Sequence, residues 1–243
     1  GECWLQWCTY NDKGDARWYV AADGALAANG LATSTLYTVN GGVFGPDYNP
    51  DNTRLALFGG LEMIFDGIGG TRQRGFTKYT NPDTGEVVRF VVEPFTRAEG
   101  FFNSPDQTQE FHAAAVTGSW FNPDRNGEGF HLQILTDNTA VMQWYSFTPD
   151  GDKQRIVSSG GQISYPSTDS VLLEFTDAYT GSGGIFGPDF NPDDIILAPW
   201  GNLQFELSCE GGAVHYQAID PDYGSGSLPI IRLTASEFNS YPF

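Results

Sequence analysis

Two short loops place oxygen-bearing side chains at alternate positions, a spacing that a calcium ion can use. The residues are Asp47, Asn49 and Asp51 in the first loop, and Asp189, Asn191 and Asp193 in the second. Carboxylate and amide oxygens close together in the chain are the ligands that Ca²⁺ prefers. Neither loop is an EF-hand, because the twelfth position, where that motif has glutamate, holds Phe58 or Trp200. Asn-Pro and Gly-Pro sequences also make ordinary turns, so a calcium site and an Asx turn are alternative interpretations.

The residues that common hydrolases need for catalysis are scarce. The histidines are His112, His131 and His215, and none lies in the part of the first half that matches the second. A Ser-His-Asp site would therefore be confined to the second half. The chain has no Gly-x-Ser-x-Gly, His-Glu-x-x-His, phosphate-loop or Cys-x-x-Cys sequence. We predict no catalytic residue and no cofactor other than calcium, which favours a protein without enzymatic activity.

The two carboxylate loops belong to a long internal repeat. The decapeptides Gly41–Pro50 and Gly183–Pro192 are identical at eight of ten positions, and Trp7–Tyr10 upstream of the first matches Trp144–Phe147 upstream of the second. Chance does not give such similarity, so the chain is a tandem duplication. A residue that carries chemistry in one copy should therefore have a counterpart in the other copy or be a specialisation of one copy.

The second copy opens with a segment that the first copy lacks. Gly118–Phe130 reads Gly-Ser-Trp-Phe-Asn-Pro-Asp-Arg-Asn-Gly-Glu-Gly-Phe, whereas residue 1 lies just before the Trp-containing strand of the first copy. We therefore divide the chain into a first β repeat at 1–98 that lacks its N-terminal strands, a linker at 99–116 and a complete second β repeat at 117–243.

The pattern Gly118-x-Trp-Phe-x-Pro-x-x-x-Gly-x-Gly-Phe130 resembles the opening of an aromatic- and glycine-rich β repeat of secreted proteobacterial proteins. The resemblance continues through the Trp144–Gly151 turn and the Gly201–Phe205 strand to Ile230–Leu233. It implies a β fold and a secreted protein, extracellular or at the surface of a Gram-negative bacterium. It implies no catalytic residue. The first copy departs from the family because it lacks the opening motif.

Composition and alternation predict strands along most of the chain. Glycine, proline and aromatic residues are frequent, and windows such as Gln204–Ser208 alternate polar with apolar residues. We predict an all-β fold of two tandem antiparallel meander domains, each barrel- or sandwich-like. In the second copy we expect strands at 118–122, 130–135, 140–147, 153–160, 170–177, 194–199, 202–209, 213–219 and 228–234. The only place that suits a helical turn is around Gln107–Ala115.

The chain is strongly acidic. Its net charge is −18, and its only lysines are Lys13, Lys78 and Lys153. An acidic protein is repelled by nucleic acid and by anionic membrane surfaces, so we expect neither as a partner. The same charge keeps a protein soluble and attracts cations. No run of 18 apolar residues is present, so we expect no transmembrane helix and no membrane insertion.

The cysteines allow at most one intrachain disulfide. Cys3 and Cys8 fall on one expected strand, where they face opposite sides about 17 Å apart and do not pair unless the strand is broken. Cys209 reaches one of them only if the two copies pack closely. A bond between molecules and buried thiols are the alternatives.

Aromatic residues on the expected strands fit either a sugar-binding face or a core. They are Trp4, Trp7, Tyr10, Trp18, Tyr19, Trp120, Trp144 and Tyr145. Rings stack on the faces of sugars, which would make a glycan a partner. Alternation along a strand sends part of the set inward, so core packing is the other interpretation.

The missing strands suggest how the protein works. A sheet with two unpaired edges is unstable unless those edges are covered. Strands donated by the linker of the same chain, or by a neighbouring molecule, would cover them. In the second case the chain polymerises head to tail. We therefore predict a secreted, non-enzymatic, self-associating structural protein of filament or matrix type. The alternative is an extracellular module that binds a glycan or small ligand, and a hydrolase with its site in the second repeat has the least support.

Overall fold

The computed structural model describes residues 2–27, 31–66, 74–93, 96, 113–208 and 211–234. The chain forms two compact units, and the described residues contain strands and short 3-10 turns but no α-helix. Unit 1 consists of Gly1–Gly41, Arg54–Thr96 and Ser182–Ile195. Unit 2 consists of Gly42–Thr53, Arg97–Gly181 and Ile196–Phe243. The predicted all-β fold of two meander domains is confirmed.

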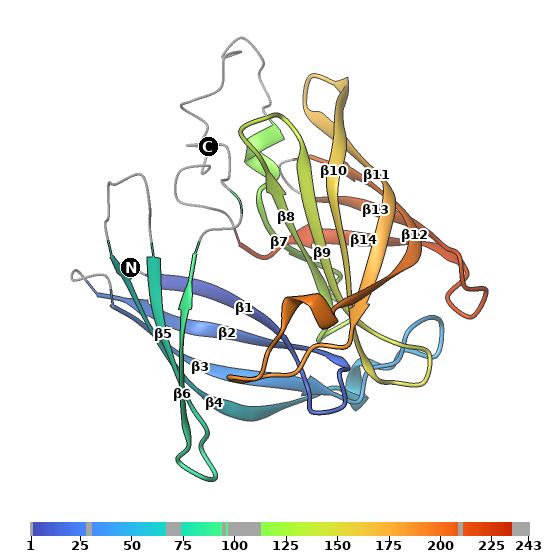
Figure 1. Cartoon of the computed structure of the whole chain (residues 1–243). Coiled ribbons are helices and arrows are strands. Elements are labelled where there is room, and N and C mark those ends of the chain that lie inside the picture. The colour runs from blue at the N-terminus through green and yellow to red at the C-terminus, as the bar shows by residue number, and fades with distance from the viewer. Residues whose placement is uncertain are drawn as a thin grey trace. The chain divides into compact units, whose positions relative to one another are not determined.

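Unit 1 is an open antiparallel meander in which every strand pairs with the next one in the chain (Figure 1). Its strands are β1 (Glu2–Tyr10), β2 (Ala16–Leu26), β3 (Leu31–Asn40), β4 (Arg54–Asp66), β5 (Arg74–Thr80) and β6 (Val87–Val92). The sheet order β1-β2-β3-β4-β5-β6 makes β1 and β6 its two edges. Short connections explain this order, because antiparallel strands joined by tight turns pair with their sequence neighbours.

The core of unit 1 is a stack of rings on the inner face of this sheet. Phe58 of β4 lies flat between Tyr19 and Tyr79, with ring centroids 3.6 and 5.0 Å away. Leu36 and Leu61 are buried beside them. The Tyr79 hydroxyl donates a hydrogen bond of 2.8 Å to the Phe58 carbonyl, which satisfies the polar end of a buried ring.

Unit 2 is a closed antiparallel barrel (Figure 1). Its strands are β7 (Gly118–Phe121), β8 (Gly129–Ile134), β9 (Ala140–Phe147), β10 (Lys153–Ser167), β11 (Ser170–Ser182), β12 (Ile196–Leu207), β13 (Gly211–Ala218) and β14 (Ser225–Arg232). Pairing of Phe121 with Ile231 and of Trp120 with Arg232 joins the first strand to the last. Closure leaves this sheet without a free edge.

Two of the expected strands of the second copy are one strand in the structure. The sequence predicted separate strands at 194–199 and 202–209, whereas β12 runs unbroken through Gly201. This glycine has φ of 152°, and a Cβ there would lie 2.1 Å from the Gln217 carbonyl oxygen. Glycine thus lets β13 approach β12 closely. The predicted break between two strands was wrong, because a glycine inside a strand can serve such a close approach instead of a turn.

The interior of the barrel is filled by side chains. Trp120, Phe130, Trp144, Phe175 and Phe205 are among its fully buried rings. Phe130 of β8 and Trp144 of β9 pack with ring centroids 4.9 Å apart. An eight-stranded barrel has room for little beyond its own side chains, so this interior is a core.

The units correspond strand by strand, with one difference. β1 matches β9 through the Trp7 and Trp144 segments, and β2–β6 match β10–β14 in the same order. β7 and β8 have no counterpart in the described part of unit 1. The expected helical turn is represented by a buried 3-10 turn at Ala113–Val116, and the rest of that prediction lies outside the described residues.

Each unit contains a short segment from the sequence repeat that otherwise forms the other unit. The chain leaves unit 1 after Gly41, contributes residues 42–53 to unit 2 and returns to unit 1 at Arg54. It likewise leaves unit 2 after Gly181, contributes residues 182–195 to unit 1 and returns at Ile196. These exchanged segments contain most of the two repeated decapeptides. The division of the sequence into repeats at 1–98 and 117–243 with a linker at 99–116 stays a prediction, and the compact units differ from it by these exchanged segments.

Candidate functional site

The repeated decapeptide is seated in unit 2 by one phenylalanine. Phe44 is 5 % exposed, and its ring lies 4.9 Å from Tyr223 and 5.4 Å from Trp144. Its backbone N–H donates a hydrogen bond of 3.1 Å to the Thr148 carbonyl. Gly42 lies against the ring of Phe147, where a Cβ would be 2.2 Å from a ring carbon. Glycine and phenylalanine in the loop therefore complete the core of unit 2.

The second decapeptide is seated in unit 1 in the same way. The Phe186 ring lies 5.3 Å from Trp7 and 5.8 Å from Tyr79. The N–H of Gly183 donates a hydrogen bond of 2.9 Å to the Gly14 carbonyl. Gly184 lies against Tyr10, the counterpart of Phe147, and a Cβ there would be 2.4 Å from that ring. The Gly-Gly-x-Phe-Gly sequence shared by both loops is the signal for this packing role, which was not among the predictions.

The predicted calcium ligands lie in or just before 3-10 turns that follow the seated phenylalanines. Asn49 caps the turn Pro50–Asn52 and accepts a hydrogen bond of 2.9 Å from the N–H of Asp51. Asn191 caps Pro192–Asp194 and accepts one of 3.2 Å from Asp193. These bonds explain both asparagines as Asx caps.

The surroundings of the two loops bear on the calcium prediction. Within the described ranges, no three side chains of His, Cys, Asp or Glu are grouped so as to hold a metal ion. A calcium ion at Asp47, Asn49 and Asp51, or at Asp189, Asn191 and Asp193, would rely on backbone carbonyls and water for its other ligands. Calcium at these loops stays a prediction.

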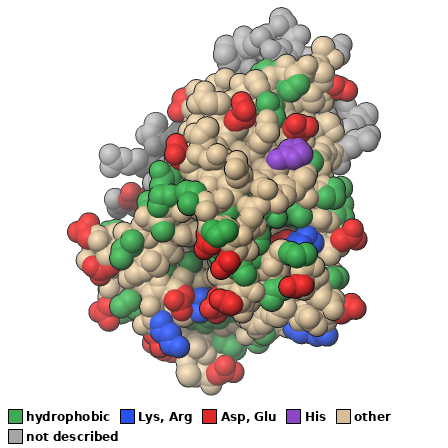
Figure 2. All heavy atoms as spheres, turned by 90° about the vertical axis from the view of Figure 1, so that its right-hand side faces the viewer, with side chains coloured by type: hydrophobic (Ala, Val, Ile, Leu, Met, Phe, Trp, Pro, Cys, Tyr) green, Lys and Arg blue, Asp and Glu red, His purple; other side chains and the backbone are tan. Residues whose placement is uncertain are grey.

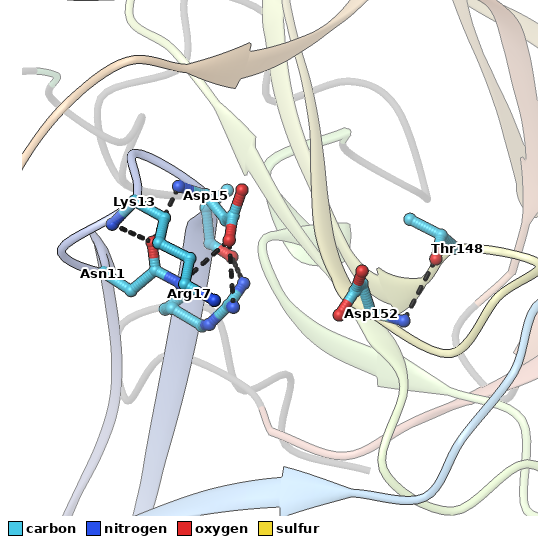
Figure 3. A network of polar contacts seen from close by, with 7 residues as sticks. Asn11, Lys13, Asp15, Arg17, Thr148 and Asp152 are labelled. Carbon is cyan, nitrogen blue, oxygen red and sulfur yellow. Dashed lines mark hydrogen bonds and ion pairs between the residues drawn. The ribbon is translucent and has the colours of Figure 1, made fainter.

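Two hairpin turns, at residues 11–15 and 148–152, are held by hydrogen bonds between side chains and backbone N–H groups (Figure 3). In unit 1, the Asn11 side-chain oxygen accepts hydrogen bonds from the N–H groups of Lys13 and Asp15. The Asp15 carboxylate pairs with Arg17 at 3.3 Å. In unit 2, the Thr148 hydroxyl accepts a hydrogen bond of 3.0 Å from the N–H of Asp152. These side chains hold the turns that the decapeptide loops lie against.

A buried ion pair fixes the exchanged loop to the β7–β8 turn in unit 2. The Glu128 side chain is only 3 % exposed and pairs with Arg125 three residues earlier. The Ser146 hydroxyl donates a hydrogen bond of 2.7 Å to the other Glu128 oxygen. The Arg125 guanidinium donates to the Gly45 carbonyl at 3.1 Å and lies 4.2 Å above the Tyr48 ring. Arg125 thus joins a loop carbonyl, a loop ring and a buried carboxylate.

The surroundings of this pair shift two pKa values. Burial raises the pKa of Glu128, and the nearby Arg125 guanidinium and the Ser146 hydroxyl offset part of this effect. Burial and the Glu128 charge raise the pKa of Tyr48 to about 12. Its hydroxyl donates a hydrogen bond to the Asn126 carbonyl in the same turn. Removal of one partner of a buried ion pair leaves an uncompensated charge, so the loop and the turn depend on each other.

The two described histidines lie in different surroundings. His131 lies 3.4 Å from the Ser119 hydroxyl, but Ser119 is buried and closed to an external substrate. Burial lowers the pKa of His131. His215 lies on the surface, 4.0 Å from Glu206. His112 lies outside the described residues.

The aromatic residues singled out as a sugar-binding face are mostly in the two cores. Buried members of the set are Tyr10, Trp18, Tyr19, Trp120, Trp144 and Tyr145. Trp4 and Trp7 of β1 are half-buried. Core packing therefore explains most of this set.

The edge strand β1 is less covered than its counterpart β9. Trp144 and Ser146 of β9 are fully buried, because β8 pairs along that strand with Phe130 opposite Trp144. The matching residues of β1, Trp7 and Thr9, are only half-buried. Among the described residues of unit 1, no strand takes the place beside β1 that β8 takes beside β9.

The structure also bears on the predictions about surface charge, membrane helices and cysteines. Figure 2 shows acidic side chains scattered over one face with few basic ones between them. No helix in the described ranges has the length and apolar character needed to cross a membrane. Cys3 and Cys8 both lie on β1, as expected, and Cys209 lies outside the described residues.

No family model, curated protein or solved structure matches this chain.

Replacement of Phe44 by alanine should strongly destabilise unit 2, because it leaves a cavity among Trp144, Tyr223 and their neighbours. Loss of a buried phenylalanine costs about 3–5 kcal/mol of unfolding free energy. Urea unfolding followed by tryptophan fluorescence measures this cost. Phe190→Ala in the other decapeptide is the control, since Phe190 is 47 % exposed and its loss should cost less than about 1 kcal/mol. Equal effects of the two substitutions would contradict the seated role of Phe44.

Replacement of Glu128 by glutamine should change how stability depends on pH. The unfolded carboxyl has a pKa of 4.5, and burial raises the pKa in the native state. Between these pKa values the native state binds more protons, so the contribution of Glu128 to the unfolding free energy falls as pH rises. The difference between wild type and Glu128→Gln should therefore decline as pH rises above 4.5.

Urea unfolding at a series of pH values measures this difference. Glu206→Gln, which removes a carboxylate from the outer face of β12, is the control variant. A difference between wild type and Glu128→Gln that is constant with pH would contradict the assignment.

Proposed function

We propose that this protein is a non-enzymatic, self-associating structural subunit of an extracellular assembly, in which strands of a neighbouring molecule complete unit 1. One observation carries the proposal. The same repeat forms a closed barrel with β7 and β8 in unit 2, and an open sheet with edges β1 and β6 in unit 1. An unpaired strand edge offers backbone donors and acceptors to another chain. The extracellular location rests on the resemblance of the opening motif to repeats of secreted proteins.

An apolar row on the outer face of unit 1 supports association. Ile64, Phe76 and Val91 are cross-strand neighbours on β4, β5 and β6, and each is about half exposed. Clustered exposed apolar side chains mark interaction surfaces more often than single ones do.

Unit 2 lacks this row at the matching positions. There, the paired residues on β12, β13 and β14 are Glu206, Ala213 and Pro229. Because the two units share one ancestry, the apolar row is a specialisation of the unit whose sheet is open. This is the pattern expected if unit 1, and not unit 2, is the part that meets a neighbour.

Assembly is tested by light scattering and negative-stain microscopy of the full chain over a range of protein and salt concentrations. We expect regular filaments or large ordered particles, and assembly should strengthen as salt screens the net charge of −18. The variant Phe76→Ser, which removes the centre of the apolar row, should assemble less readily. Ala213→Ser, at the matching position of unit 2, is the control and should assemble as the wild type does. A homogeneous particle of 26.5 kDa under all conditions would contradict the proposal.

The calcium prediction belongs to the same proposal, because a cation would lower the repulsion between acidic subunits. Assembly should then be stronger in calcium than in a chelator at equal ionic strength. Calcium is titrated into the wild-type chain and, separately, into the variant Asp189→Asn, and isothermal titration calorimetry measures whether the loops bind the ion. If neither titration gives heat, the calcium prediction is wrong. The proposal that a neighbouring molecule completes unit 1 is not affected by this result.

A further inference from the structure

Unit 1 contains a binding site for a loop that the other repeat supplies. The loop, Ser182–Ile195, connects β11 to β12, and we call it the arm. Its Phe186 ring lies 5.3 Å from Trp7 of β1 and 5.8 Å from Tyr79 of β5. We call the residues of unit 1 that receive the arm the seat: Trp7, Tyr10, Gly14 and Tyr79.

The seat contacts features of the arm that are close together in sequence. The Gly183 N–H donates a hydrogen bond of 2.9 Å to the Gly14 carbonyl. Gly184 packs against Tyr10, where a Cβ would lie 2.4 Å from the ring. Phe186 supplies the ring two residues later. Because these groups fall within four consecutive residues, the seat fits the same arm from any molecule that presents it.

The arm is held less firmly than the matching loop in unit 2. Phe44 is 5 % exposed, whereas Phe186 is only half-buried. The Arg125 guanidinium lies 4.2 Å above the Tyr48 ring, whereas Phe190, at the matching position of the arm, is 47 % exposed. Release of the arm therefore exposes less newly wetted apolar surface than release of the first loop does.

Exchange of the arm between molecules keeps its contacts with the seat. An element that lies in the identical site of a second copy buries the same rings and makes the same hydrogen bond. The exchanged form loses only the advantage of the tether, which acts as a local concentration of the order of millimolar for a short connection. The chain's own arm therefore fills the seat in dilute protein, and the arm of a second copy competes at high protein concentration.

An exchanged arm joins two different surfaces. Each molecule has one arm and one seat, and they come from opposite repeats of the chain. A contact between unlike surfaces is heterologous, and such contacts continue from molecule to molecule until they close a ring or form a filament. This is the geometry that a self-associating subunit needs.

We propose that, in the assembled protein, the arm of each molecule lies in the seat of the next, whereas the first loop stays in its own chain. The partner is a second copy of this chain, and it contributes Gly183, Gly184 and Phe186 to the core of unit 1. This inference rests on the self-association in the proposed function. It does not depend on whether the edges of unit 1 are covered, so arm exchange and strand completion can fail separately.

Photo-crosslinking of mixed isotope-labelled chains tests the exchange. The full chain with Phe186→p-azidophenylalanine, which keeps the ring, is made with natural nitrogen, and the wild-type chain is made with the heavy nitrogen isotope. Equal amounts are mixed in urea, refolded, assembled and irradiated. Mass spectrometry of the digest identifies crosslinks from the arm to peptides that contain Trp7 or Tyr79, and shows whether each seat peptide is light or heavy.

In assembled protein, about half of these crosslinks should join a light arm to a heavy seat, because a neighbour drawn from an equal mixture is heavy half of the time. In dilute protein they should be light only, since each seat holds its own arm. Tyr48→p-azidophenylalanine is the matched control in the first loop. Its crosslinks to the turn that contains Asn126 should be light only in both states.

A chain-terminating variant gives an independent measurement. A molecule with Phe186→Ala has a seat that receives an arm, but its own arm lacks the ring that fills the next seat. Added to wild type in minor proportion before assembly, it should shorten filaments severalfold in electron micrographs. Phe190→Ala, on the exposed part of the same arm, should leave their length unchanged.

The contrary outcomes are distinct. Arm–seat crosslinks that stay light only in assembled protein would keep the arm in its own chain and overturn this inference, without affecting strand completion. Mixed crosslinks from Tyr48 as well would mean that both loops exchange, and would overturn the assignment to the arm. Crosslinks to neither Trp7 nor Tyr79 would remove the seat. Absence of assembly under all conditions would contradict this inference and the proposed function together.

Discussion

The two cores depend on a phenylalanine that each receives from the loop of the other repeat. Phe44 is surrounded by rings of unit 2, and Phe186 lies against Trp7 and Tyr79 in unit 1. A fragment cut along the sequence boundary would lack the ring that completes its own core. The strongest sequence signal, the repeated decapeptide, is therefore explained first by packing. Glycines in that repeat allow the backbone to lie against Phe147 and Tyr10.

A single hairpin separates the closed unit from the open one. β7 and β8 pair with β14 and β9, cover Trp144 and bring Arg125 and Glu128 onto the seated loop. In the described part of unit 1, β1 and β6 are the edge strands, and several of their residues are only half-buried. The cost of unpaired edges and exposed rings is what makes a completing strand favourable. The structural role proposed for the protein follows from this difference between two copies of one repeat.

Much of this architecture could be predicted from the sequence, because duplication and alternation are local patterns. The all-β class and the meander order followed from the repeat and from the alternation of polar and apolar residues, and the lack of opening strands in the first repeat stays a prediction. The exchange of loops could not be predicted, since a loop seated in its own repeat and one seated in the other have the same local sequence. The burial of Glu128 could not be predicted, because burial of a carboxylate depends on tertiary partners such as Ser146.

The central claim is that the edges of unit 1 are open in the single molecule and are covered in the assembly. Amide hydrogen exchange with mass spectrometry tests it directly, because β1 and β9 are matched strands in one chain and report on an open and a closed seam. In dilute protein, peptides from Glu2–Tyr10 should exchange much faster than those from Ala140–Phe147, and in assembled protein they should become equally slow. Equal protection of the two strands in dilute, monomeric protein would contradict the account.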